Sequence, residues 1–317
     1  MNLNSGNLRT YAGPLLTPYA MAIADSYRDQ RVVFINVPTN LTNTVREERV
    51  FVTDPLDHDV LIIGAHINIG SVSNGDFGQQ VLLNVSDMTT GLMWSTPNPL
   101  DASPATAFGG SQFNAMPFVK LPEAFFLAAN TRLKHQWKVL GLATGGVLTW
   151  VGIQLFRPRG GKAPTHVKMP DGSTIRVGSR VPWFCTLGMG TEISILGSPS
   201  FVLGNGNQYV QFTAPMDCDL EIHDLHANWF TQLGTTTNPE DVLIKIGDKG
   251  EPQFWQPSQT PATAILGDFS KVFPEMPFTK PYLQKAGDRL QITTINRSGA
   301  AINNALLTVR GVQLCQF

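Results

Sequence analysis

Apolar positions along this 317-residue chain mostly alternate with polar ones or run without interruption, rather than following the 3.6-residue period of a helix. The first half contains VLIIGAHINI, QVLLNV and VLTWVGIQLF, and the second half contains DLEIHDLHANWF, DVLIKI and ALLTVRGVQL. Clusters of Pro, Gly, Asn and Ser separate these runs. Many short strands divided by turns are typical of an antiparallel β-sandwich. The pattern therefore predicts an all-β, jelly-roll-like chain.

One stretch is long enough to be read as a helix instead. Residues 122–140, PEAFFLAANTRLKHQWKVL, have few turn residues. The matching stretch of the second half, however, contains Pro281 and Gly287, which are unfavourable inside a helix. We therefore expect a strand, a loop and a second strand over residues 122–140.

The same series of residues occurs twice in the same order. PLDHDVLIIGAHIN begins at Pro55 and PMDCDLEIHDLHAN begins at Pro215, an offset of 215 − 55 = 160 residues. Trp94 and Trp255 follow at an offset of 161. An ordered series at a nearly constant offset indicates an internal duplication. The fold expected is thus two tandem antiparallel β-sandwiches.

The duplication divides the chain into four segments of ordinary domain or linker size. Residues 1–48 are expected to form an N-terminal arm, and residues 49–158 the first sandwich. Residues 159–210 are expected to form a basic hairpin linker with the leader of the second unit, and residues 211–317 the second sandwich. Each core follows a leader of similar length, which suggests a leader and a core, repeated, although the sequences of the two leaders do not establish it.

The leader contains a strand-like run outside the duplicated series. Residues 19–30 favour a short helix, and RVVFINVP at residues 31–38 favours a strand. A terminal strand of a sheet exposes unpaired N–H and C=O groups that a visiting strand can satisfy. We therefore expect the leader to act as an arm that pairs with a neighbouring subunit. The arm residues assigned to assembly are Arg31, Val32, Val33, Phe34 and Ile35.

The linker gathers positive charge in a chain that carries little charge. Within it, VKMPDGSTIRV predicts a hairpin that turns at Pro170, Asp171 and Gly172. We expect the basic side chains to steer and register contacts with acidic neighbours. The linker residues assigned to assembly are Arg157, Arg159, Lys162, Lys168, Arg176 and Arg180.

Composition narrows the classes of partner. Charged residues make up 15% of the chain, and its net charge of −1 makes nucleic-acid wrapping unlikely, since wrapping requires a basic face. No apolar run approaches the length of a membrane span, and the N-terminus lacks a signal-peptide pattern, which predicts synthesis in a cytoplasm. The three cysteines have no CxxC spacing, so free buried thiols are expected. No cofactor, small-molecule substrate or membrane partner is predicted.

Repeated acidic and histidine residues are the candidate metal ligands. Two carboxylates and an imidazole suit a divalent cation, but a DxD at the entrance of a strand also caps turns through side-chain to backbone hydrogen bonds. Because the set occurs in both halves, we favour a structural role over a metal site. The set comprises Asp57, Asp59, His66, Asp217, Asp219 and His226.

No constellation in the sequence indicates catalysis. There is no carboxylate dyad, no phosphate-binding glycine loop followed by GK[ST], and no G-x-S-x-G elbow. The prediction is a non-enzymatic protein without catalytic residues. Neighbouring aromatic residues leave a carbohydrate groove open as an alternative to core packing. They are Trp183, Phe184, Trp229 and Phe230.

The C-terminal block resembles a known family of sequences. MPFTKPYLQKAGDRLQITTINRS, closing with LTVRGVQL, is similar to a recurring pattern in virion proteins of tailed bacteriophages. In the first half, Asn130-Thr131 stands where the second half has Gly287-Asp288.

The resemblance implies a structural component of the virion, such as a capsid-decorating, collar or baseplate protein. Such a component is made in the host cytoplasm and assembles as a homo-oligomer and with other virion proteins. The alternative function is a carbohydrate- or receptor-binding β-sandwich module.

Overall fold

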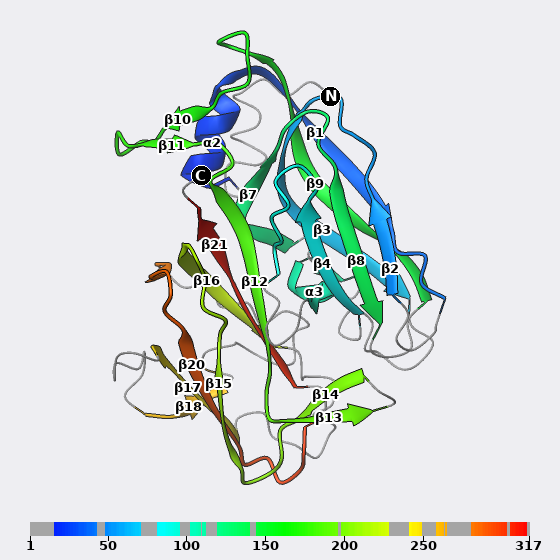
Figure 1. Cartoon of the computed structure of the whole chain (residues 1–317), viewed down its shortest axis with the longest axis vertical. Helices are drawn as coiled ribbons and strands as arrows, with labels where there is room; N and C mark the ends of the chain where they lie inside the picture. Colours follow the sequence, from blue (N-terminus) through cyan, green and yellow to red (C-terminus); the bar gives the residue numbers. More distant parts are fainter. Residues whose placement is uncertain are drawn as a thin grey trace.

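The computed structural model of the chain is built almost entirely from strands (Figure 1). The only named helices of the described part are α2 (Pro18–Asp25) and α3 (Ala105–Phe108). The structure describes residues 16–42, 48–70, 81–95, 102–108, 110–111, 119–139, 144–195, 198–227, 241–248, 258–262, 264, 280–302 and 305–315.

The first sandwich consists of two sheets. One sheet has the order β1-β9-β3, with β7 antiparallel and the short β6 parallel to β3. The other has the order β2-β8-β4-β5. The strands are β1 (Tyr27–Pro38), β2 (Glu48–Val52), β3 (Asp59–Gly70), β4 (Val81–Asp87), β5 (Ser103–Pro104), β6 (Gly110–Ser111), β7 (Val119–Leu127), β8 (Leu133–Val139) and β9 (Thr144–Pro158).

The second sandwich also has two sheets, ordered β12-β21-β16-β19 and β15-β20-β17-β18. Two hairpins, β10-β11 and β13-β14, complete the described strands. The bounds are β10 (His166–Lys168), β11 (Thr174–Arg176), β12 (Arg180–Gly188), β13 (Thr191–Ile195), β14 (Ser198–Val202), β15 (Gln208–Phe212), β16 (Asp219–Ala227), β17 (Val242–Asp248), β18 (Thr260–Pro261), β19 (Tyr282–Gln284), β20 (Leu290–Asn296) and β21 (Leu306–Leu314).

Strand order is the same in the two sandwiches, sheet by sheet. β1-β9-β3-β7 corresponds to β12-β21-β16-β19, and β2-β8-β4-β5 corresponds to β15-β20-β17-β18. His66 pairs with Thr149 and His226 pairs with Thr308, so the two histidines take matching register positions. Figure 1 shows the first sandwich above the second. Trp255, the expected counterpart of the buried Trp94, lies outside the described residues, and the duplication stays a prediction.

Each sandwich encloses its own apolar core. In the first, Trp94, Trp137 and Trp150 are fully buried between the two sheets. In the second, Ile222 of one sheet and Ile292 of the other belong to one buried cluster. Alternating burial along β8, in which every second residue is buried, places the apolar side chains inward.

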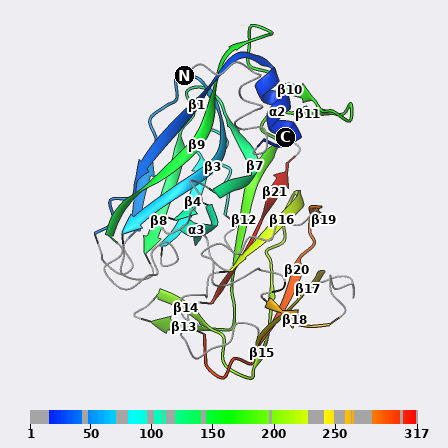
Figure 2. The same ribbon diagram turned by 180° about the vertical axis from the view of Figure 1, so that it is seen from behind.

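Uninterrupted apolar runs arise where a sheet is covered on both faces. The outer face of the sheet that contains β3 and β9 packs under α2 and the β10-β11 hairpin. There, Leu61 and Ile153 lie against Tyr19 and Ile23 of the helix, in one buried cluster with Val167 of the hairpin. Figure 2 shows the helix and the hairpin together on one side of the first sandwich. A second cover removes the solvent-facing positions and therefore the alternation.

Helix α2 begins where its sequence predicts. Thr17 has an extended backbone, and its Oγ1 accepts a hydrogen bond from the Ala20 backbone N–H at 3.2 Å. Pro18 follows at the first helical position, where a missing N–H costs nothing. The helix ends at Asp25, and β1 starts two residues later at Tyr27.

Most of the predicted secondary structure is confirmed. Residues 122–139 form strand, loop and strand, as β7 and β8. The hairpin turns at Pro170-Asp171-Gly172, with Gly172 at φ +87° and the Asp171 carboxylate accepting from the Ser173 N–H at 2.9 Å. The all-β, tandem-sandwich class is likewise confirmed.

The expected pairing of residues 31–38 with a neighbouring subunit is wrong. Residues 31–38 are a strand, but β1 pairs antiparallel with β9 of the same chain from Tyr27↔Pro158 to Pro38↔Val147. The matching strand of the second unit, β12, pairs with β21 in the same way. The strand-forming run completes the chain's own sheet, so deleting residues 1–45 would remove part of the first sandwich.

Candidate functional site: a charged junction between the sandwiches

The repeated aspartates cap turns in both sandwiches. Asp59 accepts hydrogen bonds from the Tyr27 hydroxyl at 2.6 Å and the Ala129 N–H at 2.7 Å. Asp219 accepts from the Lys285 ammonium at 2.8 Å and the Ala286 N–H at 2.9 Å. The Lys285 hydrogen bond, followed by the Ala286 one, lowers the pKa of Asp219. Asp59 and Asp219 thus make the backbone contacts that the structural interpretation expects.

The capped turns share one backbone geometry despite their different sequences. Asn130 has φ +65° and Gly287 has φ +83°, both in the left-handed region. The Asn130 N–H donates to the Leu56 carbonyl at 2.7 Å, and the Gly287 N–H donates to the Met216 carbonyl at 2.8 Å. Asparagine tolerates this conformation better than most residues with a side chain. The departure of the first half from the phage-like pattern thus preserves the turn.

The six candidate metal ligands do not form one site in either sandwich. Asp59 and His66 lie seven residues apart on β3, a separation of about 23 Å at roughly 3.3 Å per residue. Asp219 and His226 have the same spacing on β16. Asp57 and Asp217 are exposed beside the turns, and the described residues contain no group of three or more potential ligands placed to hold a metal ion.

Replacing Asp59 with alanine should lower the free energy of unfolding by about 1–2 kcal/mol, because the buried Tyr27 hydroxyl and the Ala129 N–H lose their acceptor. Urea denaturation of the full chain measures this loss. Asp57→Ala is the matched control and should stay within about 0.5 kcal/mol of the parent. Chelator should leave the melting temperature of the parent unchanged. A fall of several degrees that calcium restores would show that a cation occupies the turn.

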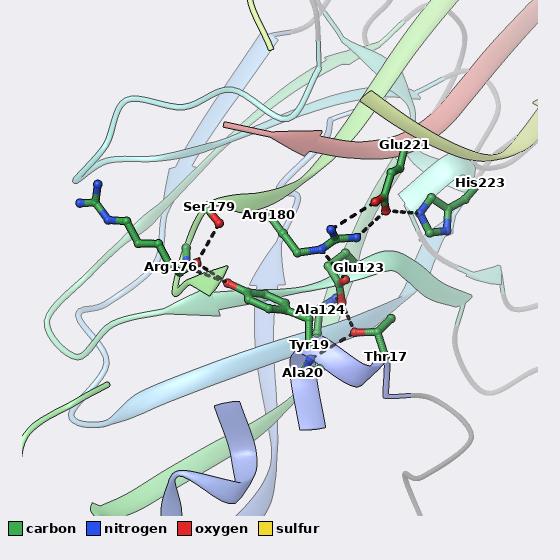
Figure 3. Close-up of polar contacts among 11 residues, drawn as sticks. Thr17, Tyr19, Ala20, Glu123, Ala124, Arg176, Ser179, Arg180, Glu221 and His223 are labelled. Carbon is green, nitrogen blue, oxygen red and sulfur yellow. Dashed lines mark hydrogen bonds and ion pairs between the residues drawn. The ribbon is translucent and has the colours of Figure 1, made fainter. Parts of the chain in front are cut away.

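A second polar cluster joins the two sandwiches around Arg180 (Figure 3). Arg180 opens β12, and its Nε donates to Glu123 Oε2 of β7 at 3.0 Å. Its Nη1 donates to Glu221 Oε1 of β16 at 3.3 Å, and its Nη2 donates to Glu221 Oε2. Only 16% of the Arg180 side chain and 2% of the Glu123 side chain are exposed. Since β7 belongs to the first sandwich and β16 to the second, one guanidinium bridges both.

Helix α2 closes the first-sandwich side of this cluster. Glu123 Oε1 accepts from the Thr17 hydroxyl and from the Ala124 N–H at 3.0 Å. The N-cap residue of α2 is thereby bound to the same carboxylate as Arg180. The fixed position of α2 over the sheet follows from these contacts as well as from its apolar face.

Tyr19 forms the wall of the cluster beside Arg180. The Arg180 guanidinium carbon lies 5.9 Å from the centroid of the Tyr19 ring, within the range of a cation–π contact. The Tyr19 hydroxyl accepts from the Gly178 N–H at 2.8 Å and donates to the Arg176 carbonyl at 3.4 Å. Burial is the main cause that raises the pKa of Tyr19 to about 12, so the hydroxyl remains protonated.

Charges in the cluster compensate one another. Burial alone would raise the pKa of Glu221, but His223 and Arg180 outweigh it and lower that pKa to about 2. His223 Nε2 lies 3.6 Å from Glu221 Oε2. Burial likewise opposes the charge of Arg180, yet hydrogen bonds and attraction from Glu221 and Glu123 raise its pKa. The arrangement therefore keeps Arg180 and Glu221 ionised and bound to each other.

Arg310 is a second buried arginine at the junction. Its Nε lies 3.3 Å from Asp224 Oδ1 on the neighbouring strand of the second sandwich, and its side chain is 1% exposed. Its Nη2 donates to the backbone carbonyl of Lys120, on β7 of the first sandwich, at 2.8 Å. Arg180 and Arg310 each bind a group on β7 from a strand of the second sandwich, so both can hold one sandwich against the other.

The sequence analysis did not identify Arg310 or the acidic residues of the junction, which are Glu123, Glu221 and Asp224. Glu123 stands in the apolar run LPEAFFL, and Arg310 stands in LLTVRGVQL. A lone charge inside a buried strand requires a partner, so each run signals a buried ion pair. The sequence does not reveal which distant strand supplies that partner.

Among the linker residues assigned to assembly, Arg180 is bound within the junction, whereas Arg157 and Arg159 have partners in their own chain and remain exposed. Arg157 forms an ion pair with Asp29, and the Arg159 Nε donates to the Asp25 carbonyl at 2.9 Å. Arg180 binds Glu123 and Glu221, as described above. Arg157 and Arg159 bind groups of the same chain, because the linker lies beside β1 and α2. Lys162, Lys168 and Arg176 are exposed, and their role in assembly stays a prediction.

Aromatic residues considered for a carbohydrate groove are core residues where the structure describes them. Trp183 and Phe184 are both 0% exposed. Phe184 stacks on Phe108 of α3 with ring centroids 4.1 Å apart, so it contributes to packing between the units. Trp229 and Phe230 lie outside the described residues. None of the described helices is long and apolar enough to cross a membrane.

Comparisons with known proteins found only weak structural similarity. No family model and no curated protein matches the chain. A chain from the atomic structure of Sulfolobus Turreted Icosahedral Virus aligns with a TM-score of 0.37 and 9% identity over 90% of each chain.

The major capsid protein P2 from bacteriophage PM2 aligns with a TM-score of 0.36 and 10% identity over 90% of this chain and 98% of that chain. A peptide-N(4)-(N-acetyl-beta-D-glucosaminyl) asparagine amidase aligns with a TM-score of 0.32 and 9% identity over 90% and 98%. Viral capsid proteins are thus among the similar structures, as is an enzyme, and likeness at this level carries no argument about activity.

Proposed function

We propose that this chain is a non-enzymatic structural protein of a virion, which assembles with copies of itself and with other virion proteins. The observation that carries the proposal is the placement of exposed apolar side chains on terminal strands of the sheets. Among the described residues, five of the seven exposed large hydrophobic residues lie on such strands: Phe34 on β1, Val50 on β2, Val210 and Phe212 on β15, and Leu283 on β19.

Terminal strands combine two features that favour assembly. Their outer edges carry backbone N–H and C=O groups available to another strand, and proteins usually protect such edges with charge or proline. Here Phe34 is 64% exposed and Val50 is 59% exposed instead. Apolar surface beside an open edge supports association with a neighbouring chain. This replaces the free arm of the sequence-based hypothesis with the edge strand β1 itself.

The charged junction supports the same proposal from within the chain. Arg180 and Arg310 hold the two sandwiches in one arrangement, so their edge strands are presented as a fixed pair. A fixed pair of edges provides a reproducible contact geometry, which a repeating particle requires. The finer proposal, a capsid-decorating, collar or baseplate protein of a tailed bacteriophage made in the host cytoplasm, rests on the sequence resemblance of residues 276–298.

Self-association of the purified full chain should depend on these edges. Phe34→Lys and Val50→Lys should each weaken association about tenfold, equivalent to about 1.4 kcal/mol, because a charge replaces buried apolar surface. Analytical ultracentrifugation over a concentration series measures the dissociation constant. Met88→Lys is the matched control, since Met88 is 54% exposed in the turn after β4 and away from the terminal strands.

Two results would contradict the proposal. One is a chain that stays monomeric at every concentration while all variants retain a strand-rich circular dichroism spectrum. The other is a copy number in purified particles that is no multiple of the particle symmetry. A soluble monomer that binds glycans would instead favour the carbohydrate- or receptor-binding alternative.

A further inference from the structure

Two of the three cysteines lie side by side at the end of the second sandwich. Cys218 directly precedes β16, and Cys315 directly follows β21. The antiparallel pair Asp219↔Leu314 places the two cysteines opposite each other one residue further along. Their Sγ atoms are 2.7 Å apart, closer than two unbonded sulfur atoms ordinarily approach. All three thiols are free, as their spacing predicts, but Cys218 is only partly buried and lies against Cys315.

The backbone at this position suits a covalent link. Directly opposed residues of an antiparallel pair have Cα atoms about 4.5–5.5 Å apart. A disulfide accepts Cα separations of about 4.4–6.8 Å. The Cys315 N–H also donates to the Ser179 carbonyl at 3.0 Å, which holds the end of β21 in place. The two sulfurs can join without a change in strand register.

The first sandwich has a different link at the same position. Asp59 pairs with Leu155 there, so His58 and Phe156 occupy the places of Cys218 and Cys315. The His58 and Phe156 rings contact each other, with centroids 4.5 Å apart. In each sandwich, a side-chain pair connects the start of one central strand (β3 or β16) to the end of the neighbouring strand (β9 or β21). Only the pair in the second sandwich can form a disulfide.

We propose that Cys218 and Cys315 form a reversible intrachain disulfide that fastens the C-terminal strand β21 to the start of β16. The oxidant is a small-molecule disulfide such as glutathione disulfide. The Cys218 thiol loses its proton, and its thiolate attacks one sulfur of the oxidant and releases the other as a thiolate. Cys315 then attacks Cys218 in the mixed disulfide and releases the second small thiol. Two protein thiols are oxidised and one disulfide is reduced to two thiols.

The surroundings assign an order to the two thiols. Cys218 is partly exposed, whereas Cys315 is buried. Burial, together with the contact to Cys218, raises the pKa of Cys315 to about 12, which keeps it protonated and disfavours it as the first attacking group. The third thiol, Cys185, is 0% exposed in the core of the second sandwich and serves as an internal reference.

Closing the disulfide would constrain the unfolded chain over a separation of 97 residues. Such a link restricts the unfolded ensemble and raises stability. It would act after the chain has left a reducing cytoplasm, because disulfides persist in oxidising surroundings. The link does not depend on the proposed function, since it needs only the folded second sandwich.

Oxidation of the folded full chain with glutathione disulfide tests the proposal. We expect the loss of two of the three thiols in a denaturing thiol assay, and a Cys218–Cys315 cross-linked peptide in mass spectrometry after non-reducing digestion. The melting temperature should rise by several degrees and return after reduction with dithiothreitol. Cys185→Ser should behave as the parent does, whereas Cys218→Ser and Cys315→Ser should form no intrachain link and show no rise.

The proposal is overturned by either of two results. One is stable mixed disulfides at Cys218 without the cross-linked peptide in the folded parent chain. The other is a cross-link that joins different chains or includes Cys185. If a serine variant fails to fold, alkylation of the parent with and without prior oxidation still decides the question, because a closed link protects both cysteines together.

Discussion

Replacing Arg180 with methionine should lower the free energy of unfolding by about 3–5 kcal/mol, the cost typical of breaking a buried ion pair by removing one partner. The change leaves the Glu123 carboxylate, 2% exposed, without the guanidinium that compensates its charge. It also removes both hydrogen bonds to Glu221 of the second sandwich and, with the contact to Glu123, the bridge to β7 of the first sandwich. Urea denaturation of the full chain, followed by circular dichroism, measures the loss.

Two comparisons make this prediction specific. Arg157→Met removes another arginine ion pair, but Arg157 and Asp29 are 74% and 45% exposed, so the cost should be at most about 1 kcal/mol. Adding Glu123→Leu to Arg180→Met should recover much of the loss, because the more deeply buried of the two uncompensated carboxylates is then absent. Equal costs for Arg180→Met and Arg157→Met would show that the junction contributes no more than a surface ion pair.

Lowering the pH should begin to destabilise the chain near pH 6.5, well above the pH at which carboxylates take up protons. Burial lowers the pKa of His135 to about 3 and, with Arg310 nearby, lowers that of His226 to about 3. Both histidines are neutral when folded, but they bind protons near pH 6.5 when unfolded. Their stabilising contribution is complete above about pH 6.5 and is lost progressively as the pH falls towards 3. Each histidine should contribute a slope on the order of 1.4 kcal/mol per pH unit.

Unfolding free energies measured by urea denaturation between pH 7 and 4 check this expectation. His135→Gln keeps an acceptor for the Trp150 Nε1–H, which now donates to His135 Nε2 at 2.8 Å, and should remove about half of the slope. His226→Gln should remove the other half. His166→Gln is the control, because His166 is exposed on the hairpin and its replacement should leave the slope unchanged. A slope that survives both core substitutions would place the acid sensitivity elsewhere.

Local features were predictable because neighbouring residues determine them. The period of apolar positions distinguishes strand from helix over residues 122–140. The Pro170-Asp171-Gly172 turn and the left-handed residue Gly287 follow from backbone preferences of the residues themselves. The constant offset between the halves led to the correct number of sandwiches. The DxD pattern also pointed to a capping role for Asp59 and Asp219, but the backbone N–H groups that they accept from, those of Ala129 and Ala286, lie 70 and 67 residues away and came only from the fold.

Tertiary structure alone decided where the strands and charges meet. The run at residues 31–38 has the same strand propensity whether it pairs with a neighbour or, as found, with β9. Arg180 finds Glu123 and Glu221 at separations of 57 and 41 residues, and Cys218 finds Cys315 at 97. Propensity acts over a few bonds, whereas these contacts depend on which distant strands become neighbours in a sheet. That choice minimises exposed apolar surface and unpaired charge over the whole chain, so no single stretch of sequence contains it.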